Sequence, residues 1–517
     1  MRIHRFHGGM RLDLRKQAAL ARPIRACPLP PELAIPLATR GEAPARALVA
    51  HGQRVRRGEA IGRAGDAHGT TLHASTSGTV VAVEPRPLAD AEVREGLCVV
   101  IEPDGADEWL RLPPIADWRA APRELLLERL RDAGTVGLGG GAFPSAIKLA
   151  AAQPTLIVNG AECEPYVACD EALLRERAEE VVAGAALLAH VLGAARTFIA
   201  VEDAMPEALA ALEIALHDAP FAGAALAAVP TRYPEGGERQ LIRALTGREV
   251  PSGGLPQDIG IVCHNVATAA AAWRAVARGE ALTSRIVTVT GAGVAEPGNF
   301  EARIGTSLEW LVAQAGGYTA RAARLLAGGP MMGIALPHDG VPVSAATHCV
   351  LVLADHDLHD DAPELPCIRC GECARVCPAQ LLPQQLLADL CADDLAGAQA
   401  HALADCIECG LCAYACPSHI PLLDWYRWGK AELRAQGDAR ARADAARGRF
   451  LARESRLARE RAERLQRSAA KRADAAASAQ PGAPTSPISK DAVLAAIARA
   501  RAKKRPPPAG GAPKDGA

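Results

Sequence analysis

Apolar and polar positions alternate between helical and β-type spacing through the middle of this chain. RELLLERLRDAG, from residue 123, has helical spacing, and after a glycine loop and a helix opening near Pro144 the β run TLIVNG occupies residues 155–160. The series continues with a helix at about 171–192, a strand at 197–202, a helix at 206–217 and a strand near 225–230. Such alternation predicts an open, largely parallel sheet with helices packed against it.

Two further segments have β-type patterns. Between residues 36 and 110, short apolar runs are separated by glycines, which predicts a small all-β module. SRIVTVTG, at 284–291, begins another β-rich unit in which one helix packs between strands. Residues 1–35 are rich in proline, and we expect an irregular arm there. The predicted fold is therefore multidomain, of mixed α/β and α+β class.

Residues 430–517 have a composition of their own. They hold 21 Lys and Arg against 9 Asp and Glu, a net +12 that leaves −13 for the first 429 residues. We expect a charged helix, the loop SAQPGAPTSP, a helix capped by Ser489 with Val493, Leu494 and Ile497 on one face, and a Pro/Gly-rich end. This basic tail suits anionic lipid or an acidic partner, whereas nucleic acid is not expected because interleaved aromatics are lacking. A solvated, partly disordered tail is the other interpretation.

The hydrophobic pattern predicts no membrane span and no signal peptide. The most apolar run, Val181 to Val201, is interrupted by His190 and Arg196 and falls short of the roughly 20 apolar residues that a span requires. The start, MRIHRFHGGM, lacks an apolar core, so we expect a cytoplasmic location. Fifteen cysteines in a reducing compartment then indicate metal binding rather than disulfides.

Eight of the cysteines lie in two blocks, CIRCGECARVCP and CIECGLCAYACP, each with the spacing C-x2-C-x2-C-x3-C-P. In this bacterial two-cluster run, three close thiolates bind one cubane and the fourth reaches the other cluster. The spacing thus predicts one [4Fe-4S] cluster on Cys367, Cys370, Cys373 and Cys416, and a second on Cys377, Cys406, Cys409 and Cys412. Zinc would not call for the third cysteine and the Cys-Pro in both blocks. Buried structural thiols are expected at Cys27, Cys98, Cys263, Cys349 and Cys391.

The glycine loop GLGGGAFPSAIK, residues 137–148, contains G-x-G-x-x-A, but its context is not that of a dinucleotide-binding loop. That fingerprint needs a strand before the loop, and here a helix precedes it. A Walker A loop is excluded too, since Lys148 does not follow the second glycine. Clustered backbone amides and Lys148, one helical turn later, suit the phosphate of flavin mononucleotide (FMN); a purely structural turn is the alternative.

Three later segments offer polar groups of the kind that gather at the carboxyl edge of a parallel sheet. VNGAECEPYVACDE presents Asn159, Glu162 and Glu164 after a strand. RYPEGGERQL is a second glycine loop that opens a helix, and CHNVATAAA places Asn265 and Thr268 at a third helix start. Taken singly, each of these is a helix cap or a turn.

The order of these motifs resembles the RnfC/RsxC family of the Rnf/Rsx ion-translocating electron transport complexes, relatives of the flavin-carrying subunit of respiratory complex I. The resemblance covers about residues 20 to 430 and implies the following organisation: an arm at 1–35, a barrel-sandwich hybrid at 36–110, an FMN/NADH-binding domain at 120–280, a soluble ligand-binding β-grasp domain at 284–340, a ferredoxin-type domain at 358–428 and the tail at 430–517. The barrel module resembles biotinyl and lipoyl carriers in fold only, because its turn, HASTSGTV, lacks their lysine.

The resemblance also implies a flavin site without a catalytic acid or base. Non-covalent FMN would be held by Gly137, Gly139, Gly140, Lys148, Asn159, Glu162, Asn265 and Thr268, with Phe143 and Glu164 on the side of NAD(H). The chain departs from the family at three places. GGGAFP replaces the usual GGAGFP, so Gly141 and Ala142 are exchanged, and Ala161 and Ala151 replace an acidic and an aromatic residue of the complex I relative.

The implied function is hydride exchange between NAD(H) and FMN, with single electrons passing through the two clusters to membrane subunits. The chain would lie peripherally on the cytoplasmic face of the bacterial inner membrane, with the other Rnf/Rsx subunits as partners and ferredoxin reached through one of them. Two alternatives remain. One is the flavin subunit of a soluble NAD-dependent or electron-bifurcating dehydrogenase or hydrogenase, and the other is a non-catalytic iron–sulfur adaptor.

Overall fold

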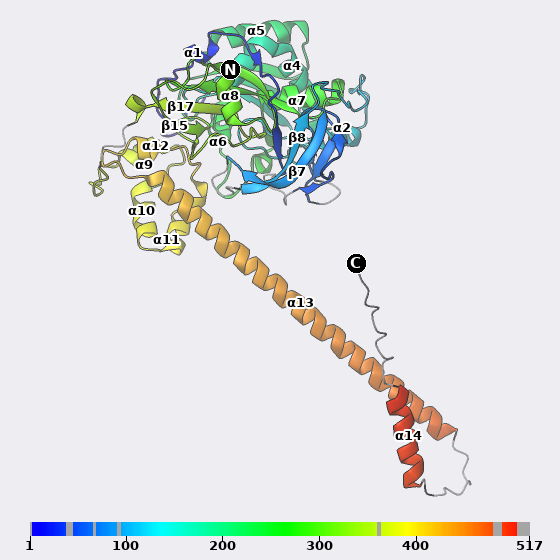
Figure 1. Ribbon diagram of the computed structural model, residues 1–517. Coiled ribbons are helices and arrows are strands. Elements are labelled where there is room, and N and C mark those ends of the chain that lie inside the picture. The colour runs from blue at the N-terminus through cyan, green and yellow to red at the C-terminus, as the bar shows by residue number, and fades with distance from the viewer. Residues whose placement is uncertain are drawn as a thin grey trace, which may run out of the picture. The chain divides into compact units, whose positions relative to one another are not determined.

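The computed structural model describes residues 3–37, 45–65, 69–89, 95–358, 363–478, 487 and 489–503. The chain divides into two units, Met1–Leu433 and Arg434–Ala517. The first unit contains three sheet-based parts followed by a small helical part that carries the cysteine blocks (Figure 1).

The central part is a four-stranded sheet in which all strands are parallel. Its order is β11 (Ala224–Val229), β10 (Arg196–Glu202), β9 (Thr155–Gly160) and β12 (Ile261–Asn265). The accompanying helices are α2 (Arg123–Asp132), α3 (Ser145–Lys148), α4 (Cys169–Leu192), α5 (Pro206–Asp218), α6 (Glu238–Thr246) and α7 (Val266–Ala277). The predicted parallel sheet is therefore confirmed, with β12 as a strand that the pattern did not predict.

Helix α4 lies at the centre of this domain because it is apolar on nearly every face. Ala, Val and Leu side chains from Val181 to Leu192 are almost all buried, and α4 packs on both α5 and α7. A helix that is hydrophobic all round is expected to be a core helix. The same run that is too short and too interrupted for a membrane span is thus the core of the flavin-type domain.

An all-β module precedes this domain, as predicted. Two sheets enclose a core that includes Val55, Ile61, Val80 and Ile101. One sheet has the order β2 (Leu33–Pro36), β8 (Glu95–Pro103), β7 (Gly78–Pro87) and β4 (Arg54–Val55). The other has the order β3 (Arg46–Ala47), β5 (Ala60–Arg63) and β6 (Thr71–His73).

A mixed six-stranded sheet follows the parallel domain. Its order is β1 (Arg25–Ala26), β14 (Gly298–Arg303), β13 (Ser284–Thr290), β17 (Cys349–Ala354), β15 (Ala322–Ala327) and β16 (Ile334–Leu336). Helix α8 (Leu308–Gln314) contributes Leu308 and Leu311 to the core beside this sheet. The unit extends beyond the expected residue 340, because β17 pairs with both β13 and β15.

The expectation of an irregular arm at residues 1–35 is wrong in part. The segment contains α1 (Gln17–Leu20), β1 and most of β2, since short apolar runs between its prolines find open sheet edges. β1 pairs in parallel with β14, and β2 pairs antiparallel with β8. The N-terminal segment thus joins two of the sheets.

The cysteine blocks lie among four short helices. These are α9 (Glu372–Val376), α10 (Pro383–Cys391), α11 (Leu395–Ala400) and α12 (Leu411–Tyr414). Leu386, Leu390 and Leu403 form their core together with Tyr426, from the first turns of α13 (Leu422–Ala477). The small apolar core therefore packs directly against the cysteine side chains.

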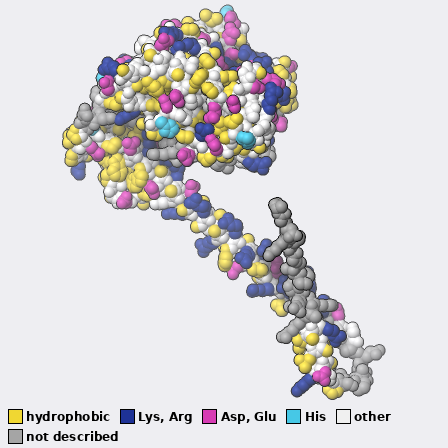
Figure 2. All heavy atoms as spheres, viewed as in Figure 1, with side chains coloured by type: hydrophobic (Ala, Val, Ile, Leu, Met, Phe, Trp, Pro, Cys, Tyr) yellow, Lys and Arg dark blue, Asp and Glu magenta, His cyan; other side chains and the backbone are white. Residues whose placement is uncertain are grey.

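The second unit contains the rest of α13 and α14 (Lys490–Lys503), and Figure 2 shows many Lys and Arg side chains along α13. The predicted cap is confirmed, since the Ala492 amide donates to Ser489 Oγ at 3.2 Å. Val493, Leu494 and Ile497 are exposed. Most of the predicted loop and the Pro/Gly-rich end lie outside the described residues. Among the helices that the structure describes, none is long and apolar enough to cross a membrane.

Candidate functional site

The glycine loop is closed by its own backbone between α2 and α3. The Gly137 amide donates to the Phe143 carbonyl at 2.8 Å, and the Ala142 amide donates to the Gly137 carbonyl at 2.9 Å. This confirms the order helix, loop, helix, strand on which the dinucleotide interpretation was rejected. Gly140 has φ +90° and Ala142 has φ +46°. The exchanged alanine thus occupies a left-handed conformation that favours glycine.

Two buried groups hold this loop from below. The Leu138 amide donates to Thr268 Oγ1 at 2.8 Å, and Arg285 donates to the Leu138 carbonyl at 3.0 Å. A Cβ at Gly139 would lie 3.2 Å from Asn265, so the loop can approach α7 this closely only as glycine. In the part of the chain that the structure describes, the amides of residues 139–141 have no protein acceptor. Three adjacent donors are therefore free to bind an anion.

Asn159 lies at the carboxyl end of β9, where the sequence places it. Its Nδ2 donates to the Gly236 carbonyl at 2.8 Å, and its Oδ1 accepts from the Ala161 amide at 3.0 Å. The side chain therefore ties the central strand to the second glycine loop, and its polar atoms are already engaged within the protein.

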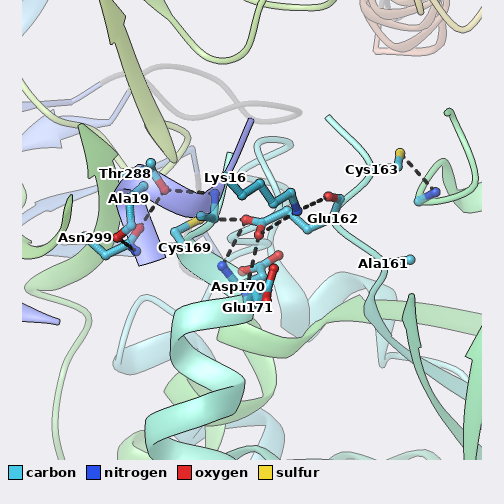
Figure 3. Close-up of polar contacts among 12 residues, drawn as sticks. Lys16, Ala19, Ala161, Glu162, Cys163, Cys169, Asp170, Glu171, Thr288 and Asn299 are labelled. Carbon is cyan, nitrogen blue, oxygen red and sulfur yellow. Dashed lines mark hydrogen bonds and ion pairs between the residues drawn. The ribbon is translucent and has the colours of Figure 1, made fainter. Parts of the chain in front are cut away.

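Glu162 is buried and caps the start of α4 (Figure 3). Its carboxylate accepts from the amides of Asp170 at 2.9 Å and Glu171 at 3.3 Å. Lys16 Nζ lies 3.4 Å from Glu162 Oε2 and also donates to the Glu162 carbonyl. An anionic cap at a helix N-terminus is favourable, and here a buried lysine from a distant segment balances its charge.

Asn265 and Thr268 lie together at the start of α7. Asn265 Oδ1 accepts from the Ala267 amide at 2.8 Å, which caps the helix, and its Nδ2 donates to Asp170 at 2.5 Å. Burial, followed by the nearby charge of Glu162, raises the pKa of Asp170 to about 7. A continuous network therefore runs from the N-terminal segment through the α4 cap to the glycine loop.

Lys148 has protein partners at its ammonium. Nζ lies 2.7 Å from Glu238 Oε1 and 3.1 Å from the Cys263 carbonyl. Burial lowers the pKa of Lys148, but the Glu238 carboxylate more than offsets this, so the pKa lies above its ordinary value. The lysine is charged, close to the loop in sequence, and shared with the second glycine loop.

Glu164 and Phe143 differ in how free they are. Glu164 Oε1 accepts from the amides of Met331 at 2.8 Å and Met332 at 3.0 Å, and burial raises its pKa. It therefore fixes a turn of the six-stranded sheet against the parallel domain. Phe143 is half-buried and leaves part of its ring open.

The eight blocked cysteines line two separate cavities. Cys367, Cys370, Cys373 and Cys416 line the first. Cys377, Cys406, Cys409 and Cys412 line the second. Cys367 and Cys370 are exposed, whereas three cysteines of the second group are buried. The Tyr233 hydroxyl, from the second glycine loop, donates to the Cys409 carbonyl at 2.8 Å.

Sequence reasoning missed several residues of this region and one exposure. Lys16, Asp170 and Arg285 carried no motif, although Asp170 follows the quoted VNGAECEP segment closely. Four of the five isolated cysteines are buried as expected, but Cys391 is exposed. It ends α10, and its apolar sequence context gave no sign that this last turn faces away from the core.

Four family models match successive parts of the chain. They are described as RnfC barrel sandwich hybrid domain at residues 4–106, Nuo51 FMN-binding domain at 130–274, SLBB domain at 286–335 and 4Fe-4S dicluster domain at 366–420. A solved NAD+-reducing [NiFe]-hydrogenase in the H2-reduced state aligns over 60% of this chain and 65% of its own, with 23% identity and a TM-score of 0.43.

Relatives named as one particular subunit of ion-translocating oxidoreductase complexes match most of the chain. The Pseudomonas aeruginosa protein is 48% identical over 97% of this chain and 66% of its own length. Those of Erwinia tasmaniensis and Salmonella gallinarum are 43% and 42% identical over 88% of this chain, and over 56% and 67% of their own lengths. The chain therefore spans about two thirds or less of these relatives. By sequence and domain content, it belongs to the RnfC family of ion-translocating oxidoreductase complex subunits.

Proposed function

We propose that this chain is a peripheral subunit of a membrane-bound ion-translocating complex that links NAD(H) to one-electron carriers. One observation carries the proposal. The second glycine loop contacts the flavin-type domain through Asn159 and the second cysteine cavity through Tyr233 and Cys409. A two-electron site and a one-electron site would thus share one short loop inside a single compact unit.

The glycine loop fits the phosphate of FMN. The free amides of residues 139–141 form a concave donor surface, and Gly139 leaves no room for a side chain beside Asn265. Adjacent backbone donors are a general means of binding phosphate. Lys148 would add positive charge nearby, with Glu238 holding it in place. FMN is therefore proposed as non-covalently bound at this loop.

Each cysteine cavity fits one [4Fe-4S] cluster. Each is lined by four thiols, three from one block and the fourth from the other, and four thiolates are the usual ligand set of a cubane. We propose Cys367, Cys370, Cys373 and Cys416 as ligands of the first cluster. Cys377, Cys406, Cys409 and Cys412 would bind the second, which lies beside Tyr233.

When bound, FMN exchanges hydride with NAD(H) and single electrons with iron–sulfur clusters, so the protein supplies binding and orientation rather than an acid or a base. Asn159, Glu162 and Asn265 would act mainly by fixing the backbone around the site, because their polar atoms are engaged by the protein. Phe143 offers a partly open ring face for the nicotinamide side. Glu164 would shape that side by holding the turn at Met331.

The surroundings of the chain belong to the same proposal. The exposed thiols of the first cavity mark the end from which electrons would leave for other subunits, with ferredoxin reached through one of them. The names of the relatives support such a complex. The basic second unit would face anionic lipid or an acidic subunit at the cytoplasmic side of the inner membrane.

Anaerobic purification of the chain tests the proposal. We expect one FMN, about eight irons per chain from two clusters, and bleaching of both chromophores by NADH. Iron without flavin would instead support the non-catalytic adaptor. Extraction of membranes with mild detergent tests the other alternative, because recovery of an active flavoprotein free of membrane subunits would favour a soluble dehydrogenase subunit.

A further inference from the structure

The N-terminal segment, residues 3–20, runs along all the parts that carry the proposed redox groups. The His4 amide donates to the Ala244 carbonyl in α6 at 2.8 Å. Met10 exchanges two backbone hydrogen bonds of 2.8 Å with Tyr233. The Tyr166 amide donates to the Leu14 carbonyl at 2.7 Å, just before α4. A segment held at so many points by its backbone has a defined position relative to both candidate sites.

At one end this segment supports the turn that bears Cys377. The Gly9 amide donates to the Val376 carbonyl at 2.9 Å, and His7 Nδ1 lies 2.9 Å from the Cys377 carbonyl. Gly8 has φ +66°, and a Cβ there would lie 2.5 Å from the Val376 carbonyl oxygen and 2.7 Å from Cys377. Only glycine combines this conformation with this approach.

The middle of the segment fills the junction between the two candidate sites. Met10 and Leu12 pack against a small buried cluster that includes Tyr233, Cys409 and Leu411. This cluster separates the second glycine loop from the second cysteine cavity. A fixed packing here sets the distance between the proposed flavin and the nearer cluster.

At its other end the segment places Lys16 inside the flavin-type domain (Figure 3). The side chain is about 4% exposed, and its ammonium contacts both the carbonyl and the carboxylate of Glu162. Burial lowers the pKa of Lys16, but Glu162, Glu202 and Glu171 more than compensate, so the pKa is raised. A buried lysine is costly unless it neutralises buried carboxylates.

Glu162 passes this constraint on to the glycine loop. It caps α4, whose Asp170 accepts from Asn265 at 2.5 Å, and Asn265 lies directly under Gly139. Without Lys16, a buried carboxylate would lose its counter-charge at the base of this network. The lysine is therefore well placed to act on the loop without touching its ligand.

We propose that the N-terminal segment is a positioning element for both redox sites, with Gly8 setting the Cys377 turn and Lys16 setting the glycine loop through Glu162. The proposal rests on the proposed function for the identity of the ligands. The positioning itself involves only protein groups. It therefore has consequences that are measurable even in a chain without flavin.

For the flavin end, the test is Lys16→Met in the full chain, with Arg15→Met as the matched control because Arg15 is adjacent but exposed. We expect Lys16→Met to raise the FMN dissociation constant at least about tenfold, to leave iron content unchanged, and to speed amide exchange at Asp170 and Glu171. The double variant Lys16→Met/Glu162→Gln should recover most of the affinity and protection, since no unpaired charge remains. Wild-type exchange in Lys16→Met, or no recovery in the double variant, overturns the assignment.

For the cluster end, the test is Gly8→Ala, with Gly52→Ala as control. Gly52 has φ +81°, and no atom lies within 4 Å of the position that a Cβ would take, so its substitution brings the same backbone strain without the clash. In dithionite-reduced protein, Gly8→Ala should change the electron paramagnetic resonance signal of the cluster bound by Cys377 and keep FMN binding. A signal identical to that of Gly52→Ala refutes this half. Absence of FMN from the wild type refutes the proposed function only, because the cluster signal and amide exchange still decide the positioning.

Discussion

The hydroxyl of Thr268 is the best single point at which to test how the glycine loop is held. Thr268 is fully buried and accepts from the Leu138 amide at 2.8 Å, while Leu138 is itself 3% exposed. Thr268→Val keeps the shape of the side chain and removes the acceptor. The amide then stays buried without a partner, at a cost of about 1–3 kcal/mol.

The second anchor decides where in this range the effect should fall. Arg285 still donates to the Leu138 carbonyl at 3.0 Å, so the loop loses one of its two attachments and stays in place. We therefore expect about 1–2 kcal/mol, which corresponds to a weakening of FMN binding by roughly five- to thirtyfold. Iron content should not change, because the cysteine cavities share no hydrogen bond with this threonine.

Fluorescence titration of flavin-free protein with FMN measures the change, and Thr268→Ser is the control because it keeps the acceptor. Thermal unfolding of the same variants without FMN shows whether the lost bond also destabilises the folded chain. If Thr268→Val binds FMN as tightly as the wild type while Thr268→Ser does as well, the loop does not depend on this anchor and the reasoning is refuted.

Three further changes test other parts of the proposal. Lys148→Ala should weaken FMN retention and spare the iron, as measured on purified protein; equal loss of both would show that Lys148 and its partner Glu238 are structural. Cys416→Ser should damage the cluster of the first cavity and leave the second signal in place, and spectroscopic loss confined to the second cluster would contradict the crossed assignment. Burial, with help from Glu202, raises the pKa of Glu235 to about 8 against about 4.3 when unfolded, so folding holds an extra proton between these values and stability falls as pH rises through them. Glu235→Gln should therefore be more stable than wild type at pH 8.5 in thermal unfolding, and parallel pH dependences of the two proteins would count against a buried, protonated Glu235.

The sequence pattern predicted the parallel sheet well because its strands are continuous apolar runs and its helices have long helical spacing. β9 and β10 coincide with TLIVNG and TFIAVE to within one residue. β12 was missed, since IVCHN is short and ends in polar residues that suggest a turn. β17 lay beyond the expected end of its unit because the pairing that recruits it joins residues far apart in the chain.

Partners across long sequence distances were the part of the site that no pattern could supply. Asn265 and Thr268 were visible because they begin a helix, and local chemistry places such residues at helix starts. Lys16 was not, because it is 146 residues from Glu162 and a lysine is ordinarily expected at the surface. The conformation of Ala142 was equally hidden, since a left-handed φ leaves no trace in a pattern of alanine and glycine.

The structure also changes what the predicted side chains are expected to do. Asn159, Glu162 and Asn265 use their polar atoms on backbone amides and on one another, so they shape the site more than they line it. The free donors are the amides of residues 139–141, which no side-chain substitution removes directly. Substitutions in the polar network should then act gradually, through the geometry of the loop. A Cβ at Gly139, 3.2 Å from Asn265, would displace the donors themselves. Gly139→Ala is accordingly expected to weaken FMN binding more than the loss of any one of those polar side chains.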